Sequence, residues 1–334
     1  MDRLPAISLS AHHNYVAFFL TLACNLRCAY CINLHDGGTR YAVAKRKHLD
    51  TEEWLLAIDR LRLRADLPLT LQGGEPTLSR SFFALAQRAD PALKMDLLTN
   101  MGFDVEELIR NVPVSRFVRE APYAAIRVTY HPGQNDIDAI IEKTVRLEAA
   151  GFRVGIYGIR HPDPHLRSEL ERAGDKCLAR GLDFRWKEFL GLWQNALHGT
   201  YKYEGAVSGQ PYRGCECRTT ELIVDPAGYV FRCHSDLYRG RGPIGHILDP
   251  GFDAGALDAF RYCAFLGDCN PCDVKVKTNR LQIFGHTSVE IRNVDAAYLT
   301  SATERAEAHI RHPGTGRSPL SPRERGETAD GVHS

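Results

Sequence analysis

The chain has 334 residues, which suggests about two domains at roughly 100–200 residues each. Its 42 Lys and Arg residues against 41 Asp and Glu give a formal charge of +1, so the charge predicts no nucleic-acid binder. No apolar run approaches the roughly 18 residues of a membrane span, and the N-terminus has no signal-peptide core. We therefore expect a cytoplasmic protein that binds neither nucleic acid nor membrane.

Strand-like and helix-like segments alternate along the first part of the chain. Short apolar runs predict strands buried on both faces, and they lie at residues 16–22, 67–71, 95–98, 125–130, 153–157 and 184–189. Asp50 predicts a helix start because Glu53 stands three residues later, and a second helix is expected from Asp136 to Gly151. These repeats predict an α/β fold, a partial (β/α)6 TIM-like barrel with its active-site loops at the carboxyl ends of the strands.

After about residue 190 this alternation ends. Residues 221–224 and 229–232 flank an Asp-Pro-Ala-Gly turn and predict a β-hairpin with no crossover helix. The predicted organisation is a barrel over 1–204, a small cysteine-rich α+β domain over 205–292, a helix over 293–311 and a disordered tail over 312–334.

The first group of cysteines follows the first predicted strand directly. Cys24, Cys28 and Cys31 can surround one small cluster, and three thiolates leave one iron of a [4Fe-4S] cluster open to an external ligand. A closed zinc site would need a fourth ligand, for which His35 is the nearest candidate. The spacing favours the cluster and leaves zinc open.

Together with the aromatic Tyr30, this triplet resembles the signature of radical S-adenosylmethionine (SAM) enzymes. Gly73, Gly74 and Glu75, followed by Pro76, resemble the Gly-Gly-Glu-Pro segment of the same family, which implies that they hold the amino group of SAM. The residue types agree, because glycines let backbone approach a ligand closely and a carboxylate suits an ammonium group.

Later strand ends carry further matches to the family. Asn100 stands in a Thr-Asn-Met-Gly turn that resembles the family's Thr-Asn-Gly turn. The resemblance implies that Thr129 and Tyr130 contact the ribose and carboxylate of SAM, and that Ile156 and Gly158 lie on its adenine side.

The adenine segment departs from the family pattern. The family has an earlier Gly and a later Glu where this chain has Val154 and His161. Lys187 and Glu188 end the sixth strand and are expected near the barrel mouth, as candidates for substrate contact or for a surface ion pair.

The second group holds six cysteines, at positions 215, 217, 233, 263, 269 and 272. Their spacing alone does not separate a zinc ribbon from an iron–sulfur cluster. With the first motif, the group resembles the Twitch/SPASM extension of radical SAM enzymes, and its short cysteine string implies one auxiliary [4Fe-4S] cluster. The implied ligands are Cys215, Cys233, Cys269 and Cys272, and Cys217 could replace Cys215.

Two cysteines of this group have no assigned role. Cys217 and Cys263 can be buried thiols, cluster ligands or catalytic hydrogen donors of the kind that radical epimerases use. Cys177 stands apart from both groups and is expected to be a small core residue.

The resemblance implies an oxidoreductase that cleaves SAM reductively to a 5′-deoxyadenosyl radical. The radical would take hydrogen from a peptide or a small polar metabolite, in an oxidation or cross-link assisted by the auxiliary cluster. The expected cofactors are SAM and two [4Fe-4S] clusters, and the expected electron donor is a flavodoxin or ferredoxin. The alternatives are a radical SAM epimerase with a cysteine hydrogen donor and, from another class, a zinc-binding module without catalysis.

Overall fold

The computed structural model describes residues 4–32, 46–207, 213–277 and 286–293. The predicted C-terminal helix and tail lie outside this part, apart from the first residue of the helix. Among the described residues, no helix combines the length and the apolar character that crossing a bilayer requires.

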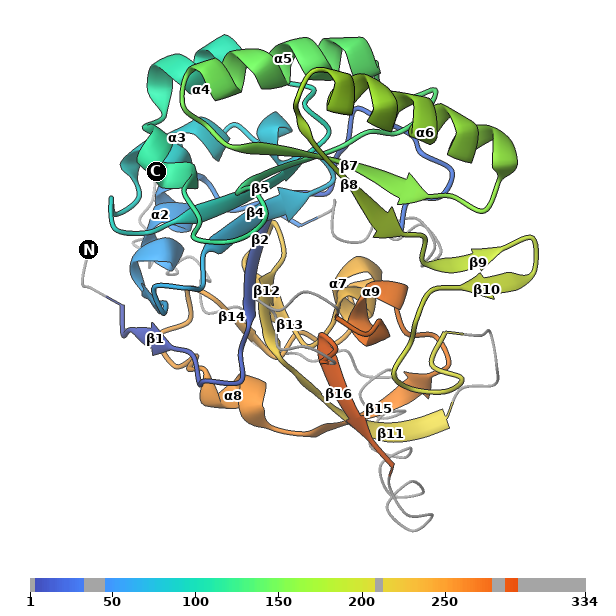
Figure 1. Ribbon diagram of the computed structural model, residues 1–334. Helices are drawn as coiled ribbons and strands as arrows, with labels where there is room; N and C mark the ends of the chain where they lie inside the picture. The colour runs from blue at the N-terminus through green and yellow to red at the C-terminus, as the bar shows by residue number, and fades with distance from the viewer. Residues whose placement is uncertain (1–3, 33–45, 208–212, 278–285, 294–334) are drawn as a thin grey trace, which may run out of the picture. The chain divides into compact units, whose positions relative to one another are not determined.

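Within the described residues, the main sheet has nine strands in the order β14-β13-β12-β2-β4-β5-β6-β7-β8 (Figure 1). Six parallel neighbours form the predicted part of a barrel: β2 (Tyr15–Thr21), β4 (Leu69–Gly73), β5 (Met95–Thr99), β6 (Ile126–Thr129), β7 (Val154–Arg160) and β8 (Asp183–Glu188). Each overlaps a strand predicted from the sequence, so the α/β class with a central parallel sheet is confirmed.

Helices connect these strands along one side of the sheet (Figure 1). They are α2 (Thr51–Asp59), α3 (Phe82–Arg88), α4 (Val105–Asn111), α5 (Ile137–Ala149) and α6 (Pro164–Ala179), with 3-10 turns η1 (Pro76–Leu78) and η2 (Val114–Phe117). The capping box predicted for α2 is present, because Asp50 Oδ1 accepts from the Glu53 N–H at 2.9 Å and Glu53 Oε2 accepts from the Asp50 N–H at 2.8 Å. Asp136 likewise caps α5.

The two faces of the sheet differ in chemistry, because side chains alternate along each strand. Phe18, Leu71 and Ile156 are fully buried in the apolar core that the helices share. The other face carries polar groups, among them Arg127 on β6 and Lys187 on β8. A polar face that ends at the carboxyl edge of parallel strands is where a barrel places its ligands.

The predicted β-hairpin is confirmed, and it extends the main sheet. β12 (Glu221–Val224) pairs antiparallel with β13 (Tyr229–Phe231) and parallel with β2, and β13 pairs with β14 (Gly245–His246). Asp225 Oδ1 holds the turn by accepting the backbone N–H groups of Ala227 and Tyr229, each at 2.9 Å. A strand from beyond residue 205 is thus added to the barrel sheet beside β2. The domain boundary near residue 204 remains a prediction.

The remaining late segments form a smaller structure beside this hairpin. Its three-stranded sheet has the order β15 (Arg261–Leu266), β11 (Arg213–Thr219), β16 (Val289–Arg292), and its short helices are α7 (His234–Arg239), α8 (Gly255–Asp258) and α9 (Pro271–Val274). Two further small sheets pair β1 (Ile7–Ser8) with β3 (Leu61–Arg62), and β9 (Gly191–Trp193) with β10 (Ala196–His198).

Candidate functional site

The loop after β2 carries the first cysteine group. The Cys24 Sγ accepts from the Leu26 backbone N–H at 3.4 Å and from the Asn100 side-chain amide at 3.7 Å, while Cys28 is buried. Amide donors aimed at a sulfur stabilise its thiolate form, which is the form that binds metal. The surroundings of Cys24 therefore fit a cluster ligand.

Two glycines bring the end of β4 against the backbone that leads into this loop. A Cβ at Gly73 would lie 2.0 Å from the Thr21 carbonyl oxygen, and one at Gly74 would lie 2.1 Å from the Ala23 carbonyl oxygen. The Gly74 N–H donates to Thr21 O at 2.9 Å, and the Glu75 N–H donates to Ala23 O at 2.8 Å. Any side chain at either glycine would push the two segments apart.

Glu75 links the ends of β4 and β5. Its carboxylate is fully buried, and its Oε1 accepts from the Thr77 hydroxyl at 2.6 Å and the Thr99 hydroxyl at 2.8 Å. Its Oε2 accepts from the Asn100 N–H at 2.7 Å. Burial raises the pKa of this carboxyl, and the hydrogen bonds oppose that shift. The side chain thus holds the ends of β4 and β5 together. Its contact with the SAM amino group remains a prediction.

Asn100 joins the turn after β5 to the cysteine loop. Its amide nitrogen donates to Asn25 Oδ1 at 2.7 Å, and its Oδ1 accepts from the Gly102 N–H at 2.8 Å. Met101 between them adopts a left-handed φ of 63°, which an L side chain seldom takes. Three motifs that are separate in sequence, the triplet, the glycine segment and this turn, thus form one hydrogen-bonded unit.

An aromatic group lies beside Tyr30. The Tyr30 hydroxyl is 3.3 Å from His131 Nδ1, and its ring centroid is 4.9 Å from that of His161. The His161 ring is only 1 % exposed and also contacts Phe189 at 4.8 Å and Trp193 at 4.5 Å. Sequence analysis noted His161 only as a departure from the family. Its burial among rings from β9 and the cysteine loop depends on contacts that sequence spacing does not reveal.

Lys187 points from β8 to the polar face of the sheet, where its Nζ donates to Thr129 Oγ1 at 3.3 Å. The Nζ also lies 4.5 Å from the centroid of the Tyr157 ring. Within the described residues it forms no ion pair, and burial lowers the pKa of this ammonium to about 7, with Arg127 and Lys275 adding to the shift. Such a cation suits an anionic ligand, and it also helps burial to lower the pKa of the His131 imidazole to about 4.

The other predicted contacts are distributed differently. Glu188 is exposed and accepts from the Thr200 hydroxyl at 3.0 Å, so it does not share the position of Lys187. Tyr130 is buried, and Ile156 belongs to the core beneath the helices. A Cβ on Gly158 would meet the Phe184 ring at 2.9 Å on that same side. Ile156 and Gly158 could therefore reach an adenine only through their backbone, and their role remains a prediction.

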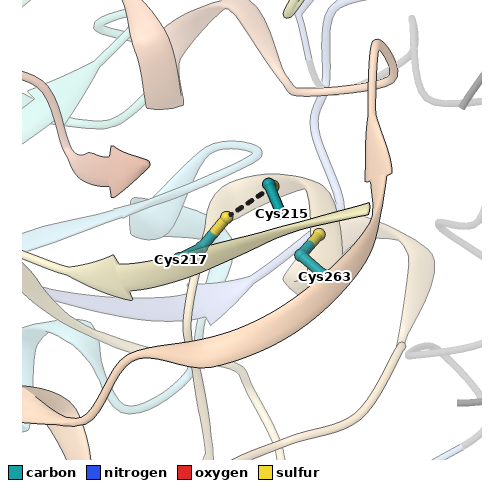
Figure 2. A group of neighbouring side chains, drawn as sticks. All are labelled: Cys215, Cys217 and Cys263. Atoms are coloured by element: carbon teal, nitrogen blue, oxygen red, sulfur yellow. Dashed lines mark hydrogen bonds between the residues drawn. The ribbon is translucent and has the colours of Figure 1, made fainter. Parts of the chain in front are cut away.

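Three of the late cysteines, Cys215, Cys217 and Cys263, lie close together on the small sheet (Figure 2). Cys215 and Cys217 lie two residues apart on β11, with their sulfurs 3.4 Å apart, and Cys263 on β15 is the cross-strand partner of Cys215. The three sulfurs lie within 4.8 Å of one another, and all three residues are buried. Strand pairing brings these thiols together across 48 residues of sequence from Cys215 to Cys263.

A small cavity of about 20 Å³ adjoins these thiols. Of the cysteines, all of which are described, Cys217, Cys233, Cys263 and Cys269 line it, and Arg232 lies among the other lining residues. The predicted ligand set named Cys215 and Cys272 in place of Cys217 and Cys263. That assignment remains a prediction, but the geometry gives Cys263 a stronger claim than its spacing did.

One of the four cavity thiols is favoured as a thiolate, since a hydrogen bond with Cys215 raises the pKa of Cys217 and burial raises those of Cys233 and Cys269. Hydrogen bonds with Cys215 and Cys217, aided by the Arg232 guanidinium, hold the pKa of the Cys263 thiol well below its usual value. Arg232 itself pairs with Asp236 at 2.6 Å. A buried set of sulfurs with one ionised member and a cation beside it fits a metal or an iron–sulfur cluster by its donor chemistry.

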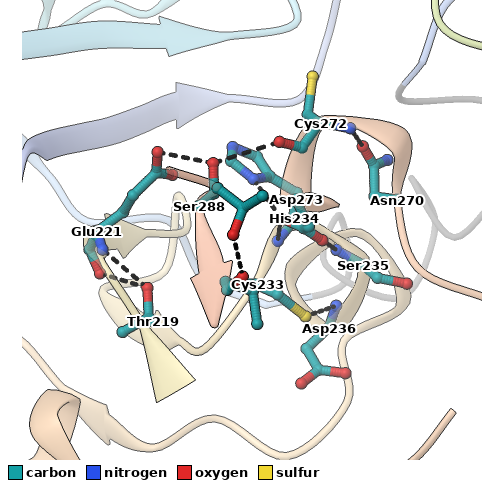
Figure 3. Close-up of polar contacts among 12 residues, drawn as sticks. Thr219, Glu221, Cys233, His234, Ser235, Asp236, Asn270, Cys272, Asp273 and Ser288 are labelled. Carbon is teal, nitrogen blue, oxygen red and sulfur yellow. Dashed lines mark hydrogen bonds and ion pairs between the residues drawn. The ribbon is translucent and has the colours of Figure 1, made fainter. Parts of the chain in front are cut away.

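Short helices carry Cys233 and Cys272 (Figure 3), and Cys269 lies in the loop before α9. Cys233 caps α7, and its Sγ accepts from the Asp236 N–H at 3.3 Å. Asp273 on α9 accepts from the His234 N–H at 2.9 Å and pairs with the His234 ring at 2.8 Å. The Cys272 sulfur points away from that of Cys233 in this view.

Sequence reasoning missed the charged residues of the inner face. Asp96 on β5 is fully buried and pairs with Arg127 on β6 at 2.7 Å and with Arg119. The signal was available, because Arg127 and Thr129 alternate with apolar residues along β6. It was hidden by treating every strand as buried on two apolar faces.

A scan against protein families finds no match. The chain is 26% identical over 329 residues to a GTP 3′,8-cyclase of Klebsiella pneumoniae, covering 90% of this chain and 92% of the relative. It is 32% identical over 112 residues to molybdenum cofactor biosynthesis protein 1 of Drosophila melanogaster, covering 33% of this chain and 19% of that protein. The crystal structure of Streptococcus suis SuiB matches with a TM-score of 0.43 at 12% identity, over 72% of this chain and 63% of SuiB. GTP 3′,8-cyclases are radical SAM enzymes that use a [4Fe-4S] cluster and SAM, which agrees with the resemblance of the cysteine motif.

Proposed function

Because the chain is a radical SAM enzyme with a cysteine-rich C-terminal region, we propose that it cleaves SAM at the loop after β2 and oxidises or cross-links a polar substrate held at the barrel mouth. The observation that carries this proposal is the hydrogen-bonded unit of cysteine loop, glycine segment and Asn100 turn. Cys24, Cys28 and Cys31 would hold the cluster. When bound, that cluster supplies the electron that splits SAM and so gives the radical that attacks a C–H bond.

The chain's own residues orient the reactants and exclude water. Asn100 fixes the cysteine loop through Asn25, and Glu75 fixes Asn100 through its backbone. The rings of Tyr30 and His161 pack together beside the cysteine loop. An ordered site suits radical chemistry, because a radical must be kept from side reactions until the substrate is aligned.

We assign the substrate-facing cation to Lys187. Its ammonium lies at the carboxyl end of β8 with one hydroxyl partner and no carboxylate among the described residues. A carboxylate or phosphate of a peptide or small metabolite would complete its contacts. The relatives' name makes GTP the first small metabolite to try.

The late cysteines would hold an auxiliary [4Fe-4S] cluster that takes an electron from the substrate or anchors it. Cys217 and Cys263 line the cavity with Cys233 and Cys269, a position that favours ligation over hydrogen donation and so argues against the epimerase alternative. One observation favours zinc in place of the cluster. Sulfurs bound to one tetrahedral zinc lie about 3.8 Å apart, and the 3.4 Å between Cys215 and Cys217 is close to that value.

Two cysteine variants test whether the first cysteine group cleaves SAM and the late group is needed for product formation. With dithionite as reductant, C28A should form no 5′-deoxyadenosine from SAM, because the cluster that binds SAM loses a ligand. C269A should still cleave SAM but give no substrate product. C177A is the matched control, since Cys177 is a buried helix residue outside both groups, and it should behave as wild type.

Metal content identifies the occupants of the two cysteine groups, and isotope transfer identifies the substrate. An anaerobic preparation with roughly eight irons and broad absorption near 400 nm supports two clusters. Four irons with a zinc whose first shell is sulfur would assign the cavity to zinc, and a colourless protein that holds only zinc would overturn the enzyme. Deuterium transfer from labelled GTP or labelled candidate peptides into 5′-deoxyadenosine would identify the substrate.

A further inference from the structure

A group of histidines lies at the other end of β2, away from the cysteine loop. Ser10, His12 and His13 precede β2, and Asp258 ends α8. The ligand atoms of His12, His13 and Asp258 all lie within 4.8 Å of one another. His13 is fully buried and the other two are partly exposed, so a solvent ion could reach the group.

The hydrogen bonds of Ser10 fix where the imidazole protons lie. The Ser10 hydroxyl has one proton, which it donates to Asp258 Oδ1 at 3.0 Å. Its oxygen must therefore accept from His12 Nδ1, which is 2.9 Å away. A neutral His12 then presents the lone pair of Nε2, and this atom lies 3.2 Å from Asp258 Oδ1.

That contact lacks the geometry of a hydrogen bond. The buried Nε2 atoms of His12 and of His13 have no hydrogen-bond partner among the described residues. An imidazole nitrogen facing a carboxylate oxygen is repelled unless a proton or a metal ion lies between them, and the missing hydrogen-bond geometry at Nε2 favours the metal ion. The spacing is that of two ligands of one ion, because nitrogen and oxygen atoms at about 2.0–2.1 Å from a tetrahedral zinc lie about 3.3 Å apart.

We propose that His12, His13 and Asp258 bind a divalent transition-metal ion, of which zinc is the type best suited to two imidazoles and one carboxylate. The donor set holds nitrogen and oxygen only, so it is chemically distinct from both cysteine groups. The Ser10 oxygen also lies 2.9 Å from His13 Nδ1, which therefore carries a proton as His12 Nδ1 does, so His13 likewise offers its unpartnered Nε2 to the ion. Of the cations near the group, Arg64 donates to the His13 carbonyl oxygen at 2.9 Å and pairs with Asp66 at 3.1 Å, and Arg218 pairs with Glu290 at 2.6 Å.

The site would fasten the segment before β2 to α8. It lies at the amino end of a strand whose seven residues span roughly 23 Å, while the cysteine loop follows the carboxyl end. The metal is therefore structural and takes no part in SAM cleavage. If the zinc site were disproved, the proposed function would still stand. If the proposed function were disproved, the zinc site would still stand.

Zinc binding to the full chain tests the proposal. Anaerobically purified protein with its clusters reconstituted is washed with chelator and then dialysed against zinc. We expect about one zinc per chain in wild type, with only nitrogen and oxygen in the first shell of the zinc X-ray absorption spectrum. H12A and D258N should each lower the zinc affinity by about tenfold or more. Zinc should raise the Tm of wild type and not that of the two variants.

His165 provides the matched control, because it is 80% exposed and pairs only with Glu169. H165A should bind zinc as wild type does. Circular dichroism and iron content equal to wild type show that H12A and D258N are folded, and D258N keeps the size of the side chain it replaces. Equal zinc affinity in wild type and both variants would overturn the site, as would sulfur in the first shell of the zinc.

Discussion

The barrel strands and the cysteine-rich region build their sites in different ways. In the barrel, each motif is contiguous in sequence and follows directly on a strand, so the fold has only to bring strand ends together. In the late region, the cavity thiols come from β11, β15, the start of α7 and the loop before α9. A site made at strand ends depends on backbone fit between loops, whereas a site made by separate short elements depends on the side chains that hold those elements in place.

The largest expected effect tests the backbone fit of the barrel site. G74A should destabilise the protein by about 3 kcal/mol or more and prevent assembly of the first cluster, because its Cβ would lie 2.1 Å from the Ala23 carbonyl oxygen. Urea unfolding and iron content measure the two losses. G133A is the control with a left-handed φ of 69° and no neighbour within 4 Å of the new Cβ, and it should lose only about 1 kcal/mol. A loss in G74A no larger than that in G133A would show that the contact with the Ala23 carbonyl oxygen does not limit this site.

A smaller effect tests the side-chain fit of the late region. D273N should cost about 3 kcal/mol at most, because the buried Asp273 pairs with His234 and accepts the first amide groups of α7. The late cysteines should lose their bound metal or cluster while SAM cleavage persists. Metal analysis and 5′-deoxyadenosine formation check the two halves of this prediction. D138N removes an exposed pair with Lys176 and should cost less than about 1 kcal/mol. Loss of metal from both cysteine groups in D273N would contradict the separation of the two regions.

The smallest effect concerns Lys187 and has the opposite sign. K187M should stabilise the substrate-free protein at pH 7 by about 1 kcal/mol while it lowers substrate turnover, because a partly buried cation without a carboxylate destabilises the fold. The pKa of Lys187 is lowered to about 7 in the folded chain, so the unfolded chain binds more protons between about pH 7 and pH 10. Wild-type stability gains from this group as pH rises through that window, and the advantage of K187M should shrink.

Chemical denaturation of both proteins at pH 7 and pH 9.5 measures this difference. K176M is the control, because Lys176 is an exposed partner of Asp138 and its replacement should give no pH-dependent gain. A K187M variant that is less stable than wild type at pH 7 would mean that the ammonium holds the fold together and is not reserved for a substrate.

Local signals in the sequence determined the barrel and its first site. The capping box at Asp50, the apolar strands and the turn at Asp225 each depend on neighbours within a few residues, and all three are present. The cysteine triplet, Gly73–Gly74 and Asn100 were each found as motifs. Their mutual hydrogen bonds follow from one rule, that parallel strands end at the same edge of the sheet.

Only the tertiary structure decided which late thiols meet and which segments far apart in sequence lie together. Cys263 meets Cys215 because β15 pairs with β11 in one register, and a slip by one residue would turn its sulfur to the other face. Likewise, β12 joins β2 and His12 meets Asp258 across more than two hundred residues of chain. Such contacts arise from the burial and pairing of whole elements, a free energy summed over many residues that no local spacing records.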